Sequence, residues 1–403
     1  MVKNKIKVKV NDEARDIQEV HPEIETFAKI KVVGIGGSGN SAVNRMVSDK
    51  IRGVEFIAIN TDAQALHHNA ARRKIHIGKN VTSGLGAGMD PEIGLKAAEE
   101  AVDQIRENLK DADMVFITCG MGGGTGTGAS PLVAEIARNL GALTVAVVTK
   151  PFSFEGAQRK SIAEQGLDKL RENVDAIIVI PNDRILQIID KKTSLLEAFN
   201  IVDEVLKNGV KGISEMITVP GEINVDFADV KSVMSDAGSA LMGIGEAGGE
   251  NRAIEAAKQA IDSPLLELSI EGARGILFTI AGNKDLGMNE VNEAAKVITN
   301  AADPNAKIIF GSIIDENLKD NVKVTVVATG FGTTPTRDKQ SQRMEFNPPA
   351  EVNQPIDTLK REPIPKRRIS KDDDRIEEKS NLPQKTKEEE ELEIPAFIRR
   401  KMM

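Results

Sequence analysis

The chain has 403 residues, and a size of about 150 residues per domain predicts two or three domains. Its 53 Lys and Arg residues against 61 Asp and Glu residues leave a formal net charge of −8, which argues against a general nucleic-acid-binding protein. The single cysteine, Cys119, excludes an intramolecular disulfide and a multi-cysteine metal site, and it fits a reducing cytosol. The N-terminus lacks the apolar core of a signal peptide, and the longest uncharged run, Met114–Ala134, is interrupted by six glycines and a proline. We therefore expect a cytoplasmic protein that does not bind nucleic acid and does not insert into a membrane.

The composition of the chain changes sharply near Gly332. All 34 glycines lie at or before this residue, whereas the 70 residues from Thr334 onward contain eight prolines and 31 charged residues. Low hydrophobicity with dense mixed charge cannot offset the entropy of ordering, so residues 333–391 are predicted to be a disordered linker. Residues 392–403 regain apolar side chains beside a basic cluster. Such a segment is typical either of a partner-binding peptide or of a terminal segment whose apolar side chains have no specific partner. Residues 1–28 mix Val, Ile and charges, and we expect a mostly disordered N-terminal extension.

The first half of the chain alternates strand-like and helix-like segments. The predicted strands are Lys29–Gly36, Val54–Thr61, Lys74–Gly78, Asp113–Gly120, Leu143–Lys150 and Ala176–Asn182. The predicted helices between them include Ser41–Ser48, Pro91–Leu109 and Ser130–Leu140. Near-continuous apolar strands that alternate with helices indicate a parallel sheet covered on both faces. Residues 29–194 are therefore predicted to form an α/β domain with a Rossmann-like parallel sheet.

A long helix and a smaller unit follow. Apolar residues recur at intervals of three and four from Leu195 to Ile217, which predicts one central helix over residues 195–218. Four further strands are predicted near Ser239–Gly243, Gly275–Ala281, Lys307–Ile314 and Val322–Thr329, with helices at Arg252–Ile261 and Asn289–Ala302. Residues 219–332 are therefore predicted to form a smaller α+β C-terminal domain.

Glycine-rich segments follow two of the predicted strands. Gly34, Gly36 and Gly39 satisfy G-x-G-x-x-G, in which glycine lets the backbone approach a phosphate and the next helix supplies free amides. This motif alone is weak: it also fits an NAD-dependent oxidoreductase with Asp62 as ribose partner, or a tight turn without ligand.

The second glycine segment is more specific. Gly120–Gly128 contains six glycines in nine residues, a large entropic cost for a purely structural loop. The amides of Gly122–Thr127 are predicted to cradle a triphosphate, and the absence of G-x-x-x-x-G-K-[ST] excludes a P-loop enzyme. A third segment, Gly84–Gly88, is expected to close over the terminal phosphate. Such loops at the carboxyl ends of parallel strands predict a mononucleotide triphosphate site.

The segment Gly122–Gly128, GGGTGTG, resembles the signature of the tubulin and FtsZ superfamily. The FtsZ branch is matched further by Asn60–Asp62, Pro151–Gly156, Pro181–Asp183 and Asn224–Asp229. The similarity spans about Ile30 to Gly332, and Ile394–Arg400 resembles the tail peptide of the family. The small departures are Ser38 and Cys119, which stand where Gly or Ala is common. The resemblance implies a bacterial, tubulin-like GTPase of cell division that binds GTP or GDP, with Mg²⁺ held through the nucleotide phosphates and not directly by the protein.

The resemblance also implies the nucleotide contacts. They are Gly36, Gly37, Ser38, Gly39, Asn40, Ser41, Asn60, Gly122, Gly123, Gly124, Thr125, Gly126, Thr127, Glu155, Arg159, Asn182, Phe199 and Asp203. Glu155 is implied to bind the ribose hydroxyls, Arg159 to lie against the nucleotide, and Phe199 to stack on the purine. A carboxylate at Asp203 selects GTP over ATP, because guanine presents N1–H and a 2-amino group and adenine lacks that donor pair. Without the resemblance, the same residues indicate an i, i+4 ion pair, a core phenylalanine and a solvated aspartate.

The catalytic residues implied by the resemblance are Asn224, Asp226 and Asp229. Their spacing alone indicates helix capping. In the family, this segment enters the nucleotide pocket of the next subunit, where its carboxylates position the water that attacks the γ-phosphate. One chain would then hold an incomplete active site, and head-to-tail contact between copies of the chain would generate filaments.

The tail supplies the remaining partner prediction. By resemblance, Ile394, Pro395, Phe397, Ile398, Arg399 and Arg400 bind membrane-tethering and regulatory division proteins at the mid-cell septum. Two competing classes remain open at this level: an oxidoreductase that uses Gly34–Gly39 for NAD, and a GTP-dependent scaffold that does not hydrolyse its nucleotide.

Overall fold

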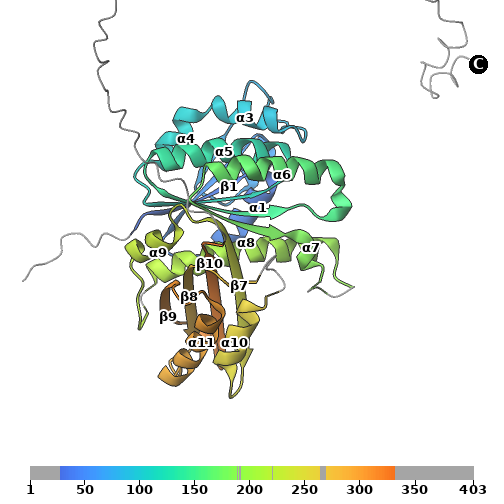
Figure 1. Ribbon diagram of the computed structural model, residues 1–403. Helices are drawn as coiled ribbons and strands as arrows, with labels where there is room; N and C mark the ends of the chain where they lie inside the picture. Colours follow the sequence, from blue (N-terminus) through green and yellow to red (C-terminus); the bar gives the residue numbers. More distant parts are fainter. Residues whose placement is uncertain (1–27, 188, 190–191, 220, 264–268, 332–403) are drawn as a thin grey trace, which may run out of the picture. The chain divides into compact units, whose positions relative to one another are not determined.

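The computed structural model describes residues 28–187, 189, 192–219, 221–263 and 269–331. They belong to one compact unit (Figure 1). The predicted linker and tail peptide, and nearly all of the predicted N-terminal extension, lie outside the described residues. Within the described part of the chain, no helix combines the length and apolar character needed to cross a bilayer.

Ten strands form one sheet in the order β3-β2-β1-β4-β5-β6-β7-β10-β8-β9. The strands are β1 (Ile30–Ile35), β2 (Val54–Asn60), β3 (Arg73–His76), β4 (Met114–Gly120), β5 (Leu143–Lys150), β6 (Ala176–Pro181), β7 (Gly238–Gly248), β8 (Gly275–Gly282), β9 (Lys307–Ile314) and β10 (Asn321–Thr329). The first six are parallel in the Rossmann order 3-2-1-4-5-6, which confirms the predicted fold class.

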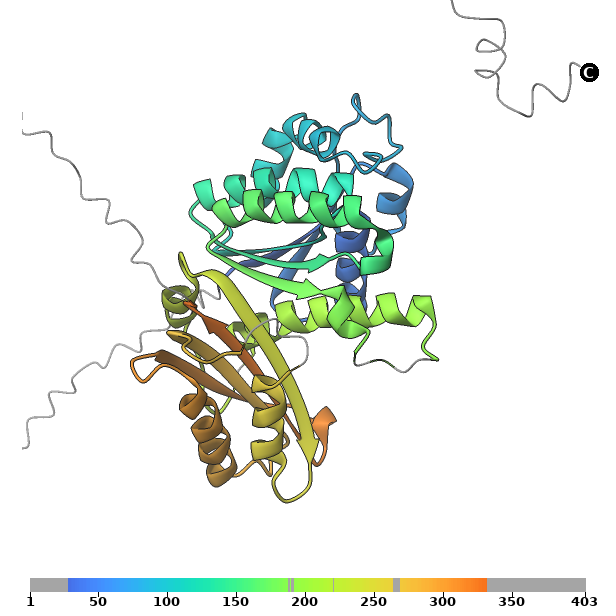
Figure 2. The same ribbon diagram turned by 45° about the vertical axis from the view of Figure 1, so that its right-hand side comes forward.

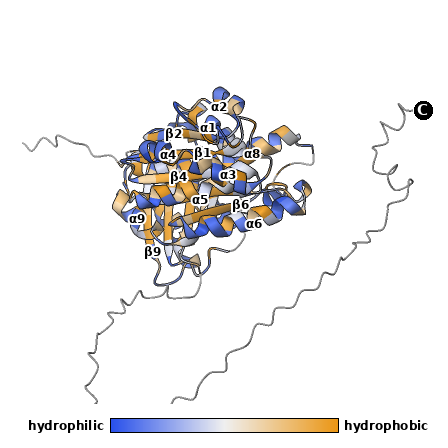
Figure 3. Cartoon of the chain, turned by 90° about the horizontal axis from the view of Figure 1, so that it is seen from above, coloured by the Kyte–Doolittle hydropathy of each residue, from blue (hydrophilic) through white to orange (hydrophobic). Residues whose placement is uncertain are grey.

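Helices cover both faces of the parallel strands (Figure 1). One face carries α5 (Gly124–Asn139) and α6 (Ala157–Glu172), with α3 (Pro91–Glu99) and α4 (Val102–Leu109) packed against α5. The other face carries α1 (Gly36–Ser48) and α8 (Leu195–Thr218). Successive strand residues point to opposite faces, so Val32 and Val33 are both fully buried but belong to different apolar clusters. The inner strands, such as β4 and β6, are accordingly apolar along most of their length, as the orange colour in Figure 3 shows. The edge strand β3 instead carries the exposed residues Arg73 and Lys74.

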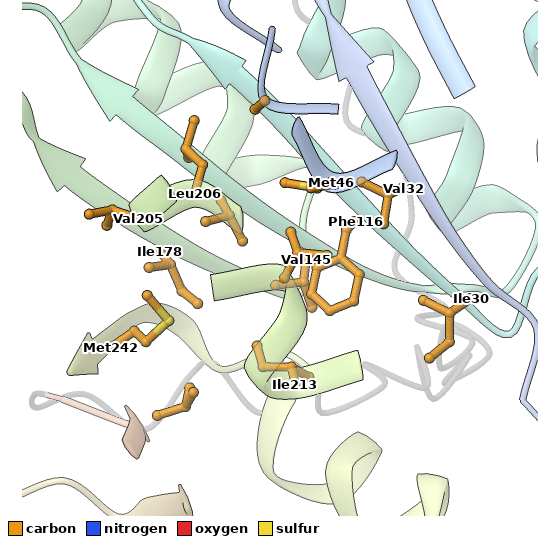
Figure 4. Packing of buried hydrophobic residues seen from close by; sticks show 14 of the residues in the cluster. Ile30, Val32, Met46, Phe116, Val145, Ile178, Val205, Leu206, Ile213 and Met242 are labelled. Carbon is orange, nitrogen blue, oxygen red and sulfur yellow. The ribbon is translucent and has the colours of Figure 1, made fainter. Parts of the chain in front are cut away.

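The central helix α8 is confirmed. Val202, Leu206, Val210 and Ile213 on its apolar stripe are at most 3% exposed. They pack in a cluster that holds Val145 of the parallel strands and Met242 of β7, with Ile178 alongside (Figure 4). This helix therefore contributes to the core beneath both the N-terminal and the C-terminal strands.

The C-terminal strands carry α10 (Arg252–Ile261) and α11 (Met288–Ala301) on one face (Figure 2). Here β7 and β8 are both antiparallel to β10, and β9 is parallel to β8. The remaining short elements are α2 (Ala63–His68), η1 (Ser153–Glu155), α7 (Asn182–Ile185), α9 (Phe227–Met234) and η2 (Glu316–Leu318).

Strand β7 joins the two predicted units into one sheet. Its first residues pair in parallel with β6, and the rest pairs with β10. It is also longer than the predicted Ser239–Gly243, and two of its glycines, Gly243 and Gly245, lie directly under α10. A Cβ atom on Gly243 would fall 1.8 Å from the carbonyl oxygen of Ala260. In the sequence these glycines suggest a loop, but in the structure Gly243 and Gly245 let the helix approach the strand closely.

Three predicted helices have the wrong bounds. Helix α1 begins at Gly36 and not at Ser41, and α5 begins at Gly124 and not at Ser130, so the glycines form the first helical turns. The predicted helix Pro91–Leu109 is two helices. It breaks because the Ala97 carbonyl accepts from the Gly78 amide, and the Ala101 amide bonds instead to the Ala98 carbonyl. That i→i+3 bond tightens and ends α3.

Candidate functional site

A cavity of about 400 Å³ opens at the carboxyl ends of the parallel strands. Thirteen of the residues predicted to bind nucleotide line it: Gly36, Gly37, Ser38, Ser41, Gly123, Gly124, Thr125, Gly126, Glu155, Arg159, Asn182, Phe199 and Asp203. They come from α1, α5, η1, α6, α7 and α8, which are far apart in the sequence. The fold therefore gathers both glycine segments and the residues at positions 155–203 around one space.

Two helices begin at the wall of this cavity. The residues that precede α1 and α5, Ile35 and Gly123, make no side-chain cap. The first-turn amides of both helices are therefore donors without a capping acceptor, and the helix dipoles add positive potential. The loops also approach each other closely: Gly36 has φ of +71°, and a Cβ atom there would lie 3.0 Å from the Gly126 nitrogen. This arrangement suits an anion such as a phosphate group.

Five residues predicted to bind nucleotide do not line the cavity: Gly39, Asn40, Asn60, Gly122 and Thr127. Gly39 packs against β4, where a Cβ atom would fall 2.3 Å from the Thr118 carbonyl oxygen. The Thr127 hydroxyl accepts a hydrogen bond from the Gly122 amide at 2.9 Å. These two residues support the shape of the glycine segments, and direct contact of any of the five with a ligand stays a prediction.

The buried amide of Asn40 is unusual. Its side chain is 4% exposed, and neither its nitrogen nor its oxygen has a hydrogen-bond partner among the described residues. Asn60, at the end of β2, is 3% exposed. The third glycine segment, Gly84–Gly88, also lies outside the lining residues, and Leu85 forms an isolated bridge with Asp62. Its closure over a phosphate stays a prediction.

Glu155 is held in place by two donors. Its Oε1 accepts from the Phe152 amide at 2.9 Å, and its Oε2 accepts from Nη1 of Arg159. The i, i+4 ion pair expected from the sequence is therefore present, and it lies on the cavity wall. A fixed carboxylate here can accept hydrogen bonds from the hydroxyls of a sugar.

Phe199 is not a core residue. Its side chain is 41% exposed, and it meets the buried Phe152 edge-to-face at 5.6 Å between ring centroids. The simple expectation from its position on the apolar stripe is thus wrong, because the stripe passes out of the core at the mouth of the cavity. A supported, partly exposed ring suits the stacking of a flat ligand.

Asp203 and Asn182 are polar residues that line the same cavity as this ring. Burial raises the pKa of Asp203 to about 6, and the positive charge of Arg45 opposes part of that rise. Asn182 is 5% exposed, and its Oδ1 has no hydrogen-bond partner among the described residues. Asp203 is thus not the solvated residue that its helical position alone indicates. Both groups have hydrogen-bonding capacity left for a ligand.

Six lining residues were not predicted: Ile35, Gly120, Met121, Thr149, Pro151 and Val202. Most of them end a parallel strand or directly follow one, and ligands of such sheets bind at the carboxyl ends of the strands. That rule could have found Thr149. Val202 lies on the apolar stripe of α8, where it belongs to the core and also lines the cavity.

The predicted catalytic residues lie elsewhere. Asn224, Asp226 and Asp229 are exposed and do not line the cavity. Asp226 caps α9 by accepting from the Ala228 amide at 3.3 Å, and Asn224 accepts from the Gly221 amide at 2.7 Å. From Asp203 to the end of α8 at Thr218 the helix runs 15 residues, or about 22 Å. The carboxylates of one chain are therefore far from its own cavity.

The described residues contain no group of three or more His, Cys, Asp or Glu side chains arranged for a metal. The carboxyl groups on the cavity wall are those of Glu155 and Asp203. This donor set fits a divalent cation only if a ligand such as a triphosphate supplies most of the oxygens. A larger cavity, about 720 Å³, surrounds Lys31, but that ammonium already donates to the carbonyls of Asn108 and Lys110.

Comparison with known proteins agrees with this geometry. The tubulin/FtsZ family GTPase domain matches residues 29–190, and the FtsZ family C-terminal domain matches residues 238–332. An empty FtsZ dimer from M. jannaschii is 51% identical with a TM-score of 0.73, over 76% of this chain and 89% of that one. A mutant FtsZ from M. jannaschii is also 51% identical with a TM-score of 0.73, over 76% and 92% of the two chains.

A more distant neighbour shares the fold. A GTPγS-bound protofilament of CetZ2 from Haloferax volcanii is 21% identical with a TM-score of 0.64, over 74% of this chain and 92% of that one. The family matches over residues 29–190 and 238–332 set aside an NAD-dependent oxidoreductase. The chain belongs to the FtsZ family and is a cytoskeletal GTPase related to tubulin.

Proposed function

We propose that this GTPase polymerises head to tail, hydrolyses GTP between adjacent subunits, and builds the division ring. The observation that carries the proposal is the separation of the anion-binding cavity from Asp226 and Asp229 by the length of α8. An active site so divided needs two chains.

The cavity is proposed to bind GTP along its length. The phosphates lie against the first turns of α1 and α5, where backbone amides without a capping acceptor form part of the cavity wall. The ribose hydroxyls bind Glu155, and the purine stacks on Phe199. Asp203 accepts hydrogen bonds from guanine N1–H and the 2-amino group, and Asn182 adds a second base contact.

The two poles of the chain have complementary roles in this proposal. The cavity lies at the carboxyl ends of the parallel strands. The segment that carries Asp226 ends at their amino ends, because Gly238 donates to the Asp175 carbonyl directly before β6. A second copy stacked along the strand direction would bring its acidic segment to the first copy's cavity. Such a heterologous contact repeats without closing and forms a filament.

The chemistry follows from the charges. Asp226 and Asp229 of the second copy would orient and polarise the water in line with the γ-phosphate. The helix amides of the first copy would stabilise the charge that develops on the phosphate oxygens. A bound Mg²⁺, held by the phosphates, would neutralise part of the same charge.

The test is the dependence of GTP turnover on protein concentration. Turnover per chain is expected to rise with concentration, because hydrolysis requires contact between chains. Asp226→Ala is expected to bind GTP normally and to lose turnover. Turnover that stays constant on dilution to a monomeric preparation would contradict the shared site, and phosphate release that is absent at every concentration would favour the non-hydrolysing scaffold.

Mixing two inactive variants makes the test sharper. Asp203→Ala impairs the cavity and keeps Asp226, whereas Asp226→Ala keeps the cavity. Their mixture is expected to regain turnover, since an Asp203→Ala chain can supply Asp226 to the intact cavity of an Asp226→Ala chain. A mixture as inactive as its components would count against catalysis between subunits.

The dimer described for M. jannaschii FtsZ supports self-association, since that protein is 51% identical to this chain. The tail peptide, Ile394–Arg400, is proposed to bind membrane-tethering and regulatory division proteins and to bring the polymer to mid-cell. Deletion of residues 392–403 is expected to leave assembly in solution intact and to abolish recruitment to membranes that carry a tether. Loss of assembly in the truncated chain would contradict a pure docking role.

A further inference from the structure

Two threonine hydroxyls are hydrogen-bonded to each other at the edge of the cavity. The Oγ1 atoms of Thr61 and Thr125 lie 2.7 Å apart. Thr125 is the second residue of α5 and lines the cavity. Thr61 directly follows β2, does not line the cavity, and has a fully buried side chain. The pair therefore connects a residue that can touch a ligand with one that cannot.

The direction of this hydrogen bond follows from the burial of Thr61. Each hydroxyl carries one proton. Among the described residues, Thr125 is the hydrogen-bond partner of the Thr61 hydroxyl, and no second acceptor is found for it. If Thr125 donated, the Thr61 proton would be buried without an acceptor, at a cost of about 1–3 kcal/mol. The Thr61 hydroxyl therefore donates and Thr125 Oγ1 accepts.

This direction leaves the proton of Thr125 free. A hydroxyl that already accepts a hydrogen bond is polarised and becomes a better donor. We propose that Thr61 is a positioning residue, which orients the Thr125 hydroxyl so that it donates to a phosphate oxygen of bound GTP. The inference rests on the proposed binding of GTP in this cavity and assigns a role to a residue that does not touch the nucleotide.

The backbone around Thr61 is held on both sides. His76 Nε2 lies 3.2 Å from the Thr61 carbonyl oxygen, and because a carbonyl only accepts, this nitrogen carries the proton. The preceding carbonyl, of Asn60, accepts from the Ile77 amide at 3.1 Å. The following side chain, of Asp62, caps α2 by accepting from the Ala65 amide at 2.9 Å. Thr61 is thus fixed before a ligand arrives, as a positioning residue must be.

Loss of the Thr61 hydroxyl is expected to weaken only the contacts with the phosphates of GTP. Thr125 stands in the first turn of α5, beside the amides proposed to bind phosphate. Phe199 and Asp203, proposed to bind the base, stand on α8. Guanosine, which has no phosphate, therefore reports on the base and ribose contacts without involving Thr125.

The test compares binding of GTP and guanosine by calorimetry. Thr61→Val removes the donor and keeps the shape of the side chain. It is expected to weaken GTP binding about three- to tenfold, the equivalent of one hydrogen bond, and to leave guanosine binding unchanged. Thr61→Ser keeps the hydroxyl and is expected to bind GTP like the wild type, whereas Thr61→Ala is expected to resemble Thr61→Val. The Ser and Ala variants isolate the hydroxyl if the Val variant folds poorly.

Thr118, on strand β4, offers a matched control. It is also fully buried, and its Oγ1 has no hydrogen-bond partner among the described residues. Thr118→Val is expected to change neither GTP nor guanosine binding. A double-mutant cycle completes the design: in a Thr125→Val background, Thr61→Val is expected to cause no further loss, because its effect passes through Thr125.

The outcomes separate the inference from the proposed function. Equal losses for GTP and guanosine, or a full further loss in the Thr125→Val background, would overturn the role of Thr61. Wild-type GTP affinity in Thr61→Val would overturn it as well. If the wild-type chain itself bound no GTP in this cavity, the proposed function would fail first.

Discussion

Arg138 and Asp236 form an ion pair that joins the last turn of α5 to the turn after α9. Helix α5 begins at the cavity and ends, about 21 Å away, at this ion pair. Asp175 lies between the two partners: its Oδ1 is 3.9 Å from Arg138 Nε and accepts from the Asp236 amide at 3.5 Å. The acidic segment 224–229 is thereby tied, through the end of α9, to the helix that starts at the proposed phosphate site.

Breaking this ion pair should separate turnover from binding. Arg138→Gln is expected to lower GTP turnover, because α9 and the acidic segment lose an anchor, and to leave GTP affinity unchanged. Both partners are exposed, so the loss of stability should be small, about 0.2–1 kcal/mol. Steady-state turnover and equilibrium binding check this. Arg106→Gln breaks the exposed pair with Asp103 and serves as the control, expected to change neither quantity.

The raised pKa of Asp203 predicts how GTP binding depends on pH. The carboxylate is proposed to accept hydrogen bonds from guanine, and it becomes protonated as the pH falls through its pKa of about 6. GTP affinity is therefore expected to drop about tenfold from pH 7 to pH 5. In Asp203→Asn this pH dependence should disappear. A drop of the same size in Asp203→Asn would assign the titration to another group.

The same shift has a consequence for the stability of the ligand-free protein. The folded-state pKa lies above the ordinary value of 3.8, so the folded chain binds the extra proton between these values. The contribution of Asp203 to the free energy of unfolding is therefore highest below pH 4 and falls as the pH rises through about 6. Asp203→Asn is expected to raise the free energy of unfolding at pH 7, measured by urea denaturation without nucleotide.

Phe199 should contribute to binding through stacking. Phe199→Ala is expected to weaken GTP binding by about 1–3 kcal/mol, the usual value for an aromatic–base stack. Binding of inorganic triphosphate, which has no base, should not change. Phe154→Ala is the control. Phe154 also contacts Phe152, on which it stacks, but it is 62% exposed and does not line the cavity. Equal losses in both variants would indicate a general effect on the aromatic cluster.

Gly36 should tolerate no side chain. Its φ of +71° and the approach of Gly126 mean that Gly36→Ala combines backbone strain with a tight contact. We expect a loss of about 1–3 kcal/mol in the free energy of unfolding, together with weaker GTP binding. Gly37→Ala is the stability control, because a Cβ atom there meets nothing within 4 Å. Unfolding in urea distinguishes the two, and similar stabilities would contradict the argument from geometry.

Several features could be predicted because they depend on local pattern. The inner parallel strands are nearly continuous apolar runs, and α8 shows its period from Leu195 to Ile217, so both follow from burial alone. The starts of α1 and α5 could not be predicted, since glycine has a low helix propensity and suggests a loop. Close tertiary contacts require several of these glycines: a Cβ atom would lie 2.3 Å from the Thr118 carbonyl oxygen at Gly39 and 2.9 Å from the Gly120 carbonyl oxygen at Gly126.

The amino-acid sequence determined which chemical groups this protein carries: two glycine segments, a carboxylate proposed to select the base, and an acidic pair, at spacings that resemble one family. Only the tertiary structure decided which of these groups meet. It brings Glu155, Phe199 and Asp203 to the glycine segments and leaves Asp226 and Asp229 beyond the far end of α8. The reason is physical: spacing along a chain specifies the face of one helix or strand, whereas the order of strands and the length of a buried helix set the distance between groups.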